Sequence, residues 1–250
     1  MTSISRSGPP DWPSLWQLPS APAWASQVDW HKADVFDPNT YSDKLSNASA
    51  VVHSMGILIE EDYKGVLTGK EPIISGLKKA FSSGERDKKK EKQLTYEAMN
   101  RDSAIILAKT AVEKNVPTFL YISAAAGAPV LPARYLSTKR ETESVLPTLA
   151  SSPEQQPREW RTVFLRPAML YDSTRPISIP LAAIAGVTSA VNSLVGGWLP
   201  GLGAAAYKPL KVAAVADAVV QAIGDEGVKG VLDVADISRL AEKAWRAGML

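Results

Sequence analysis

Short apolar runs alternate with amphipathic segments through most of this 250-residue chain. Residues 48–56 (ASAVVHSMG) form a compact apolar run closed by a glycine, and residues 118–127 (TFLYISAAAG) form a second run that ends in small side chains. Bounded runs of this kind are typical of strands buried on both faces of a parallel sheet. From Asn100, apolar residues recur three and four positions apart. This spacing predicts a helix that ends by Asn115, because Pro117 disfavours a helical residue before it.

The same alternation continues on both sides of this region. The other expected strands are at 2–6, 27–37, 161–172 (broken at Pro167) and 230–235, and the other expected helices are at 40–48, 134–146, 211–225 and 237–245. Strands and helices at this spacing predict an α/β fold with a doubly wound, mostly parallel sheet and right-handed crossovers. Residues 60–95 hold four glycines and the basic cluster RDKKKEK, and we interpret them as an irregular insertion with one short helix.

Composition excludes several classes of site. With no cysteine and two histidines, the chain has no disulfide, no thiolate metal site, no cysteine nucleophile and no histidine-rich metal centre, so we expect no metal. The net charge of +2 is close to balanced, so net charge alone gives no indication of a nucleic-acid partner, and we expect none. We interpret the basic cluster as a solvated charge run, with a patch for an acidic partner or a lipid as the alternative.

Residues at the carboxyl ends of the strands are the candidate site, because ligands of doubly wound sheets bind there. Ser123 ends one predicted strand, and Tyr135 and Lys139 lie four residues apart on the following helix, where they share a face. A nearby ammonium favours the phenolate form of a tyrosine and brings its pKa towards the range useful for proton transfer, while the serine could hold a substrate carbonyl. This layout is typical of nucleotide-dependent carbonyl or hydroxyl chemistry. The alternative is an exposed helix with a packed tyrosine and a solvated lysine.

A glycine fingerprint for a pyrophosphate should follow a strand and open a helix. Residues 201–206 (GLGAAA) fit its letters, but they follow a proline and run into another Pro-containing stretch, so we interpret them as a coincidence. Residues 65–70 (GVLTGK) lack the spacing of a phosphate loop. The sequence therefore contains no genuine fingerprint.

Seven motifs, taken in order, carry a resemblance to a known family: TSISRSG, DWHKADVFDP, AVVHSMGIL, TYEAMNRDSA, FLYISAAAG, RYLSTKRETE and VFLRPAMLYD. Their order resembles the atypical, extended short-chain dehydrogenase superfamily. Within it, the chain is similar to the fungal mitochondrial accessory proteins of ubiquinone (coenzyme Q) biosynthesis, which are related to the NADPH-binding accessory subunit of respiratory complex I. The resemblance covers nearly the whole chain and implies a Rossmann-like fold.

The resemblance also implies a role for each matching residue. Ser123, Tyr135 and Lys139 match the catalytic serine, tyrosine and lysine, and Asn100 matches a helix asparagine that supports a proton relay. The implied cofactor-binding residues are Arg6, Asp34, Val35, Ser54, Met55, Gly56, Tyr135, Lys139 and Pro167. Arg6 matches the residue that meets a 2′-phosphate, which favours NADP(H) over NAD.

The start of the chain departs from the family pattern, which has a strand, a glycine-rich turn and a helix ahead of the TSISR strand. In the strand order 3-2-1-4-5-6 the first strand is central, so without it strands two and four would lie about 9–10 Å apart with unpaired inner edges. Either these strands close up, or a partner fills the gap, or the chain is an incomplete product, which is the interpretation we favour from the sequence. We expect weak or absent NADP(H) binding, an incomplete dinucleotide-binding domain at 1–172, and a C-terminal substrate-side part at 173–250 in the same globule.

No charged residue lies between Arg175 and Lys208. The stretch is long enough to span a bilayer, but its prolines and glycines disfavour a clean helix. The alternatives are a buried helix with a loop over the site, a peripheral contact with a membrane through 177–206, and a true span. The resemblance implies the matrix side of the mitochondrial inner membrane and, as partner, a ubiquinone-biosynthesis protein assembly.

Three functions follow as alternatives. The resemblance favours an accessory protein with an NAD(P)-binding fold. The intact Ser123, Tyr135 and Lys139 favour an NADP-dependent short-chain reductase, dehydrogenase or epimerase. The missing glycine turn favours a truncated product without cofactor binding, so whether the chain is an enzyme stays open at this point.

Overall fold

The computed structural model describes residues 1–13, 20–57, 95–125, 132–150, 160–172 and 208–248. The expected insertion at 60–95, with its basic cluster, falls almost entirely outside these residues, and the uncharged stretch at 177–206 lies outside them altogether.

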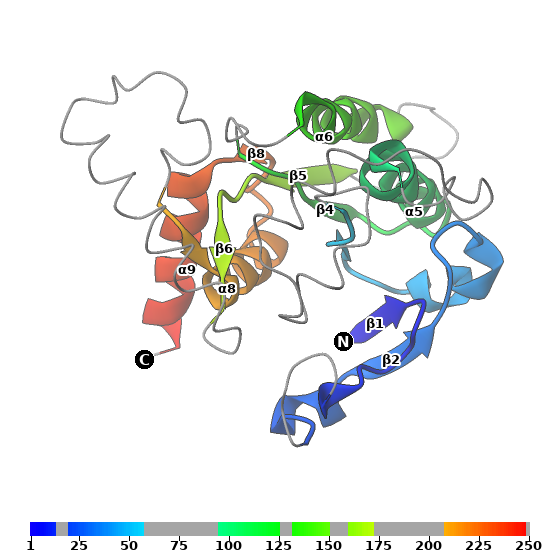
Figure 1. Ribbon diagram of the computed structural model, residues 1–250, viewed down its shortest axis with the longest axis horizontal. Coiled ribbons are helices and arrows are strands. Elements are labelled where there is room, and N and C mark those ends of the chain that lie inside the picture. Colours follow the sequence, from blue (N-terminus) through cyan, green and yellow to red (C-terminus); the bar gives the residue numbers. More distant parts are fainter. Residues whose placement is uncertain (14–19, 58–94, 126–131, 151–159, 173–207, 249–250) are drawn as a thin grey trace, which may run out of the picture.

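A four-stranded parallel sheet forms the centre of the molecule (Figure 1). Its strands are β3 (Val51–His53), β4 (Thr118–Ile122), β5 (Arg161–Leu165) and β8 (Gly230–Leu232), in the order β3-β4-β5-β8. β4 and β5 are buried along almost their whole length, and for β4 this confirms the prediction from its apolar run. In β3, which comes from the other apolar run, Val52 is 40% exposed, so the prediction of a strand buried on both faces is wrong there. The expected α/β fold with a mostly parallel sheet is confirmed.

Helices cover both faces of this sheet. Successive side chains of a strand point to opposite faces, and Phe119 and Tyr121 of β4 pack in one core with α5 (Ser103–Glu113). Leu120, between them, packs in a second core with α8 (Val212–Gly224) and α9 (Val234–Ala247). α6 (Ala133–Val145) lies beside α5 in Figure 1 and carries the predicted tyrosine and lysine.

Local sequence explains where the helices begin and end. α5 ends before Asn115, as predicted, and Asn115 adopts a left-handed conformation with φ 57°. α5 is preceded by a π-helical turn, η4 (Glu97–Asp102), so the helical region begins three residues before Asn100. α9 also begins three residues earlier than predicted, because Asp233 caps it in a capping box with Asp236.

Two shorter parallel pairs lie outside the main sheet. β1 (Thr2–Ser5) pairs with β2 (Asp29–Lys32), and β6 (Leu170–Tyr171) pairs with β7 (Leu210–Lys211). The prediction of one broken strand at 161–172 is therefore corrected: β5 and β6 belong to different sheets, because Pro167 lies between them. Of the strand expected at 27–37, the four residues of β2 form a strand in the structure. The helix expected at 40–48 is replaced by two 3₁₀ turns, η2 (Pro38–Thr40) and η3 (Ser42–Leu45).

Further 3₁₀ turns are η1 (Ala23–Gln27) and η5 (Leu146–Ala150). Within the described part of the chain, no helix combines the length and the apolar character needed to cross a bilayer. In the same residues, no three histidine or carboxylate side chains gather as a metal site would require.

Candidate functional site

A cavity of about 790 Å³ lies between the β1–β2 pair and β3. Four predicted cofactor-binding residues line it at the carboxyl ends of these strands: Arg6, Val35, Ser54 and Met55. Asp34 has a local role instead, because its carboxylate accepts a hydrogen bond from the backbone N–H of Phe36 at 3.0 Å and shapes the turn after β2. The topology thus gathers residues from three separate strand ends around one space.

Gly56, Asn100 and Lys139 form a tight group beside this cavity. A Cβ atom added to Gly56 would lie 2.7 Å from Asn100 Oδ1 and 3.1 Å from Lys139 Nζ, so a side chain there would force Asn100 or Lys139 to move. The amide of Asn100 bonds to both backbone groups of Ile57, accepting from its N–H at 2.8 Å and donating to its C=O at 3.1 Å. The side chain of Asn100 therefore holds the chain that follows β3.

The backbone of Asn100 has a second set of partners. Its carbonyl accepts hydrogen bonds from the Tyr121 hydroxyl and, at 3.1 Å, from Thr142 Oγ1 on α6. The wide π-helical turn makes this carbonyl available, and such turns are frequent at functional sites. Asn100 thus ties η4, β4 and α6 together.

Lys139 is buried and bonds to the main chain of β4. Its Nζ donates to the carbonyl of Ile122 at 2.9 Å and lies 4.7 Å from the centre of the Tyr121 ring. Burial lowers the pKa of Lys139 to about 8, although the charge of Glu143 opposes this shift. The lysine is therefore in an environment where a proton could be released near neutral pH.

Tyr135 lies on the same face of α6, but its electrostatics differ from expectation. Its ring packs against Ile57, Tyr96 and Met99, with the Tyr96 ring centre 6.0 Å away. Burial raises the pKa of Tyr135, and the neighbouring Tyr96 acts in the same direction. The expectation that the Lys139 ammonium would lower the tyrosine pKa is therefore wrong: burial raises the pKa of Tyr135, and the Lys139 ammonium is directed to the carbonyl of Ile122.

Ser123 is engaged by a carboxylate that the sequence did not single out. Its hydroxyl donates to Glu143 Oε1 at 2.5 Å, and Arg140 donates to the same serine oxygen at 3.1 Å. A serine hydroxyl has one proton to donate, so in this arrangement that proton is directed to Glu143 and not to a substrate oxygen.

Glu143 is the centre of a buried charge network. Arg140 donates to its Oε1 at 2.7 Å, and Arg166 binds both of its oxygens in a fork. Burial by itself would raise the pKa of Glu143, but the hydrogen bonds from Arg166 and Ser123 and the two arginine charges together lower it. Its spacing was the available signal, since Tyr135, Lys139 and Glu143 repeat every four residues along α6.

His53, at the end of β3, lies in the same neighbourhood. Ser103 Oγ donates to the carbonyl of Met99, so the 3.0 Å contact between His53 Nε2 and Ser103 Oγ makes Nε2 the protonated nitrogen. Its Nδ1 is then a buried acceptor, and within the described residues it has no partner. Burial, followed by the charge of Lys139, lowers the pKa of His53 to about 3, so this ring is neutral at physiological pH.

Pro167 lies in the loop between β5 and β6. It is buried, and its carbonyl accepts the backbone N–H of Ala125 at 2.8 Å, which joins the ends of β4 and β5. The structure thus separates the predicted residues into the cavity wall, the Gly56–Asn100–Lys139 group, the Ser123 network and this loop contact. Their roles stay predictions.

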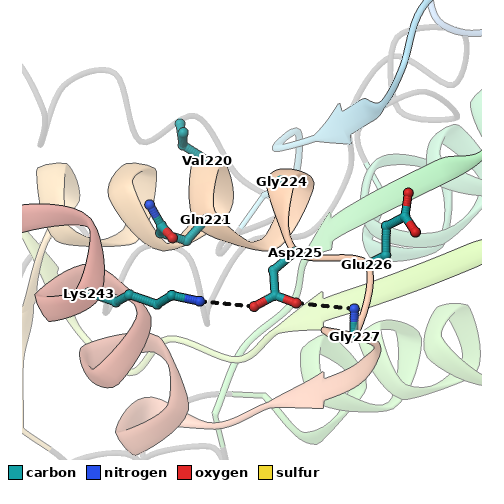
Figure 2. Close-up of a pocket in the computed structure, with 7 residues that line it drawn as sticks. All are labelled: Val220, Gln221, Gly224, Asp225, Glu226, Gly227 and Lys243. Atoms are coloured by element: carbon teal, nitrogen blue, oxygen red, sulfur yellow. Dashed lines mark hydrogen bonds and ion pairs between the residues drawn. The ribbon is translucent and has the colours of Figure 1, made fainter. Parts of the chain in front are cut away.

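A second hollow lies at the turn after α8 (Figure 2). The Asp225 carboxylate accepts from Lys243 Nζ at 3.0 Å and from the N–H of Gly227 at 3.1 Å. Asp225 and Lys243 thus form a surface ion pair with each other and are not aimed at a ligand.

Solved structures share this architecture. MoeE5 in complex with UDP-glucose and NAD is 15% identical, over 89% of this chain and 70% of that one, with a TM-score of 0.50. The UDP-N-acetylglucosamine 4-epimerase from Methanobrevibacter ruminantium M1, in complex with UDP-N-acetylmuramic acid, is 16% identical, over 96% of this chain and 72% of that one, also with a TM-score of 0.50. This chain therefore shares the Rossmann-like α/β fold of these two proteins.

A curated relative is closer in sequence than these structures. The chain is 37% identical over 191 residues to MIOREX complex component 2 of Saccharomyces cerevisiae. The match covers 70% of this chain and 65% of the yeast protein, so the chain spans just under two thirds of that relative. No protein-family model matches the chain.

A nicotinamide dinucleotide is the cofactor that the sequence resemblance implies, and MoeE5 holds NAD in its solved structure. The residues present fit such a group in part. In the cavity, Arg6 and Ser54 supply a cation and a hydroxyl that a phosphate and a ribose would need. Lys139 does not line the cavity, and its ammonium donates to the carbonyl of Ile122. The Ser123 hydroxyl donates its hydrogen bond to Glu143, and its catalytic role stays a prediction.

Proposed function

We propose that this protein is an NAD(P)-binding-fold accessory protein of mitochondrial ubiquinone biosynthesis, which acts within a protein assembly and not through oxidoreductase turnover of its own. The observation that carries the proposal is the state of the candidate catalytic groups. Ser123 is bonded to Glu143, Lys139 to a backbone carbonyl, and burial raises the pKa of Tyr135. These groups are occupied by the fold itself.

The assembly part of the proposal rests on resemblance. The yeast relative is named as a component of a complex, and the ordered motifs are similar to those of the ubiquinone-biosynthesis accessory proteins. The proposed location is the matrix side of the inner mitochondrial membrane, with peripheral contact through 177–206. Carbonate extraction that releases the protein, together with weaker liposome binding after charged substitutions at Leu194 and Trp198, would support a peripheral contact.

A matched pair of tyrosine variants tests the accessory role. In cells that depend on the protein, Tyr135→Phe should leave ubiquinone content and co-purification of partner proteins unchanged, because no proton transfer through Tyr135 is needed. Tyr171→Phe, on β6, is the control for loss of a hydroxyl elsewhere. If Tyr135→Phe lowers ubiquinone content while the amount of folded protein stays the same, the accessory role is wrong.

The second candidate is an NADP-dependent reductase, dehydrogenase or epimerase. It is favoured by the pKa of about 8 for Lys139, which lies in the range of proton-transfer groups. It is also favoured by the position of Tyr135 and Lys139 on the same helix, α6. In the reducing direction, a bound NADPH would supply the hydride to the substrate carbonyl carbon. Tyr135 would donate the proton that turns the carbonyl oxygen into a hydroxyl, and Ser123 would have to leave Glu143 to orient that carbonyl.

Titration with NADPH separates the two candidates at the level of binding. We expect weak or absent binding to this chain, measured by the change in nicotinamide fluorescence. Micromolar affinity together with turnover that Tyr135→Phe abolishes would establish the reductase instead.

A further inference from the structure

Two arginines meet at one carboxylate at the carboxyl ends of β4 and β5. Arg166 directly follows β5 and binds both oxygens of Glu143, and Arg140 of α6 donates to Glu143 Oε1 at 2.7 Å. Ser123, which directly follows β4, donates to the same oxygen. None of these four residues lines the cavity beside β1 and β3, so the group is separate from the candidate cofactor site.

The charges of this group do not balance. Among the described residues, Arg140 and Arg166 both form their ion pair with Glu143 alone, so two guanidiniums share one carboxylate. Burial lowers the pKa of Arg140; the charge of Glu143 opposes this shift, and the charge of Arg166 adds to it. The carboxylate therefore leaves part of the positive charge uncompensated.

Several N–H groups of the two guanidiniums have no acceptor within the described part of the chain. Each guanidinium carries donors on three nitrogens. Arg166 uses Nε and Nη2 for Glu143, and its Nη1 has no acceptor there. Arg140 uses Nη1 for Glu143 and Ser123 and Nη2 for the carbonyl of Ala124, which leaves its Nε. Both side chains are about one third exposed, at 33% for Arg140 and 29% for Arg166, so a small ligand can reach them.

The position of the group favours a ligand. Ligands of open parallel sheets bind at the carboxyl ends of the strands, which is where Ser123 and Arg166 lie. The residues that follow Ser123 are Ala124 and Ala125, and the buried Pro167 follows Arg166. These strand ends therefore place no large exposed side chain beside the guanidiniums.

We propose that Arg140 and Arg166 form a subsite for an oxyanion, the carboxylate or phosphate group of a small ligand, at the carboxyl ends of β4 and β5. A planar guanidinium presents paired N–H groups that match two oxygens of such an anion. The bound oxyanion compensates the charge that Glu143 leaves over. The proposal goes beyond the accessory role and the reductase alternative, and it requires no NADP(H).

Titration with simple anions tests the subsite. Sodium phosphate and sodium acetate are added separately to the full chain at neutral pH, with sodium chloride used to keep the ionic strength constant. The readout is the side-chain Nε–H signals of Arg140 and Arg166 in heteronuclear NMR spectra. We expect these signals to shift saturably with phosphate or acetate and not with chloride. Saturation with phosphate alone identifies a phosphate subsite, and saturation with acetate alone identifies a carboxylate subsite.

Substitution of arginine by lysine gives matched variants, because lysine keeps the charge that Glu143 requires but removes the paired N–H groups. Arg166→Lys should weaken anion binding about tenfold or more. Arg101→Lys is the control, since Arg101 is 31% exposed but bonds to two carboxylates, Asp102 at 2.8 Å and Glu141 at 2.7 Å. It should change anion binding by less than about twofold.

Thermal unfolding followed by circular dichroism checks that each variant is folded. Arg140→Lys is the second variant, and titration of the unmodified chain decides the proposal even where a variant does not fold. The proposal is overturned if phosphate and acetate shift the two signals no more than chloride does, or if both folded variants bind like the unmodified chain. It is also overturned if Arg101→Lys weakens binding as much as Arg166→Lys. Half-saturation only above about 100 mM would mean an adventitious ion only, and would equally overturn it.

Discussion

Replacing Glu143 by glutamine should destabilise this protein strongly at neutral pH. The carboxylate receives hydrogen bonds from Ser123, Arg140 and Arg166 and is 8% exposed. Glutamine keeps the shape of the side chain but removes its charge. It also replaces one acceptor oxygen by an NH₂ group that faces the guanidinium donors.

The magnitude follows from burial. Removing one partner of a fully buried ion pair costs about 3–5 kcal/mol, because the other charge is left uncompensated. The side chains of Arg140 and Arg166 keep 33% and 29% of their exposure, so water can compensate them in part. We therefore expect a loss of about 2–4 kcal/mol in the free energy of unfolding at pH 7.

The effect should depend on pH in a defined direction. The arginine partners lower the pKa of Glu143 in the folded state, so its stabilising contribution is present above the pKa of the unfolded chain, about 4.3. It is lost as pH falls through the lower folded pKa. The difference between the unmodified protein and Glu143→Gln should therefore be largest near pH 7 and shrink below about pH 4.

Urea unfolding at pH 7 and at pH 3.5 measures both quantities. Glu141→Gln is the matched control, because Glu141 lies on the same helix and pairs with Arg101 at 2.7 Å but is 50% exposed. That variant should lose no more than about 1 kcal/mol. Equal losses for the two variants, or a loss for Glu143→Gln that does not change with pH, would refute the reasoning.

Three further perturbations follow from the same geometry. Gly56→Ala should lower the unfolding free energy by about 1–3 kcal/mol, because its Cβ would press against Asn100 and Lys139. Gly224→Ala, whose Cβ would meet no atom within 4 Å, should be neutral or stabilising. Similar urea midpoints for the two variants would contradict this. Burial lowers the pKa of Lys139 to about 8 in the folded protein, so between pH 8 and 10.5 the unfolded chain binds more protons and the free energy of unfolding rises with pH. Lys139→Met should abolish this rise. A rise that persists in the variant would assign it to another group. Arg161→Ala should lower the free energy of unfolding by about 2–4 kcal/mol in thermal unfolding, because the Arg161 guanidinium donates to the carbonyls that end α8, at 2.7 Å for Ala222. Lys243→Ala removes only an exposed ion pair and should lower it by less than about 1 kcal/mol.

Several features of the fold could be predicted from the sequence because they depend on local signals. Continuous apolar runs marked β3 and β4, and helical periodicity placed α5, α6 and α8 within one to three residues. The parallel direction of the sheet followed from the alternation of strands and helices, since parallel neighbours need a crossover. Short elements were less predictable. The helix expected at 40–48 became two 3₁₀ turns, because contacts with α5 and not helix propensity decide the conformation there.

The candidate site shows where local signals stop. The four-residue spacing of Tyr135 and Lys139 was visible in the sequence and places both on one face of α6. Their chemistry was not, because pKa values depend on burial and on partners that are distant in the chain. Tyr135 is packed by residues of η4, and the Lys139 ammonium is held by β4.

The sequence by itself determined that this chain forms a parallel α/β sheet and which side chains stand at the ends of its strands. Only the tertiary structure decided which of those side chains meet. It joined Ser123 to Glu143 and Arg166, residues 20 and 43 positions away, and it held β1 and β3 apart around a cavity. The physical reason is that strand and helix formation is encoded by neighbours in the sequence, whereas desolvation and ion pairing arise only when separate elements pack.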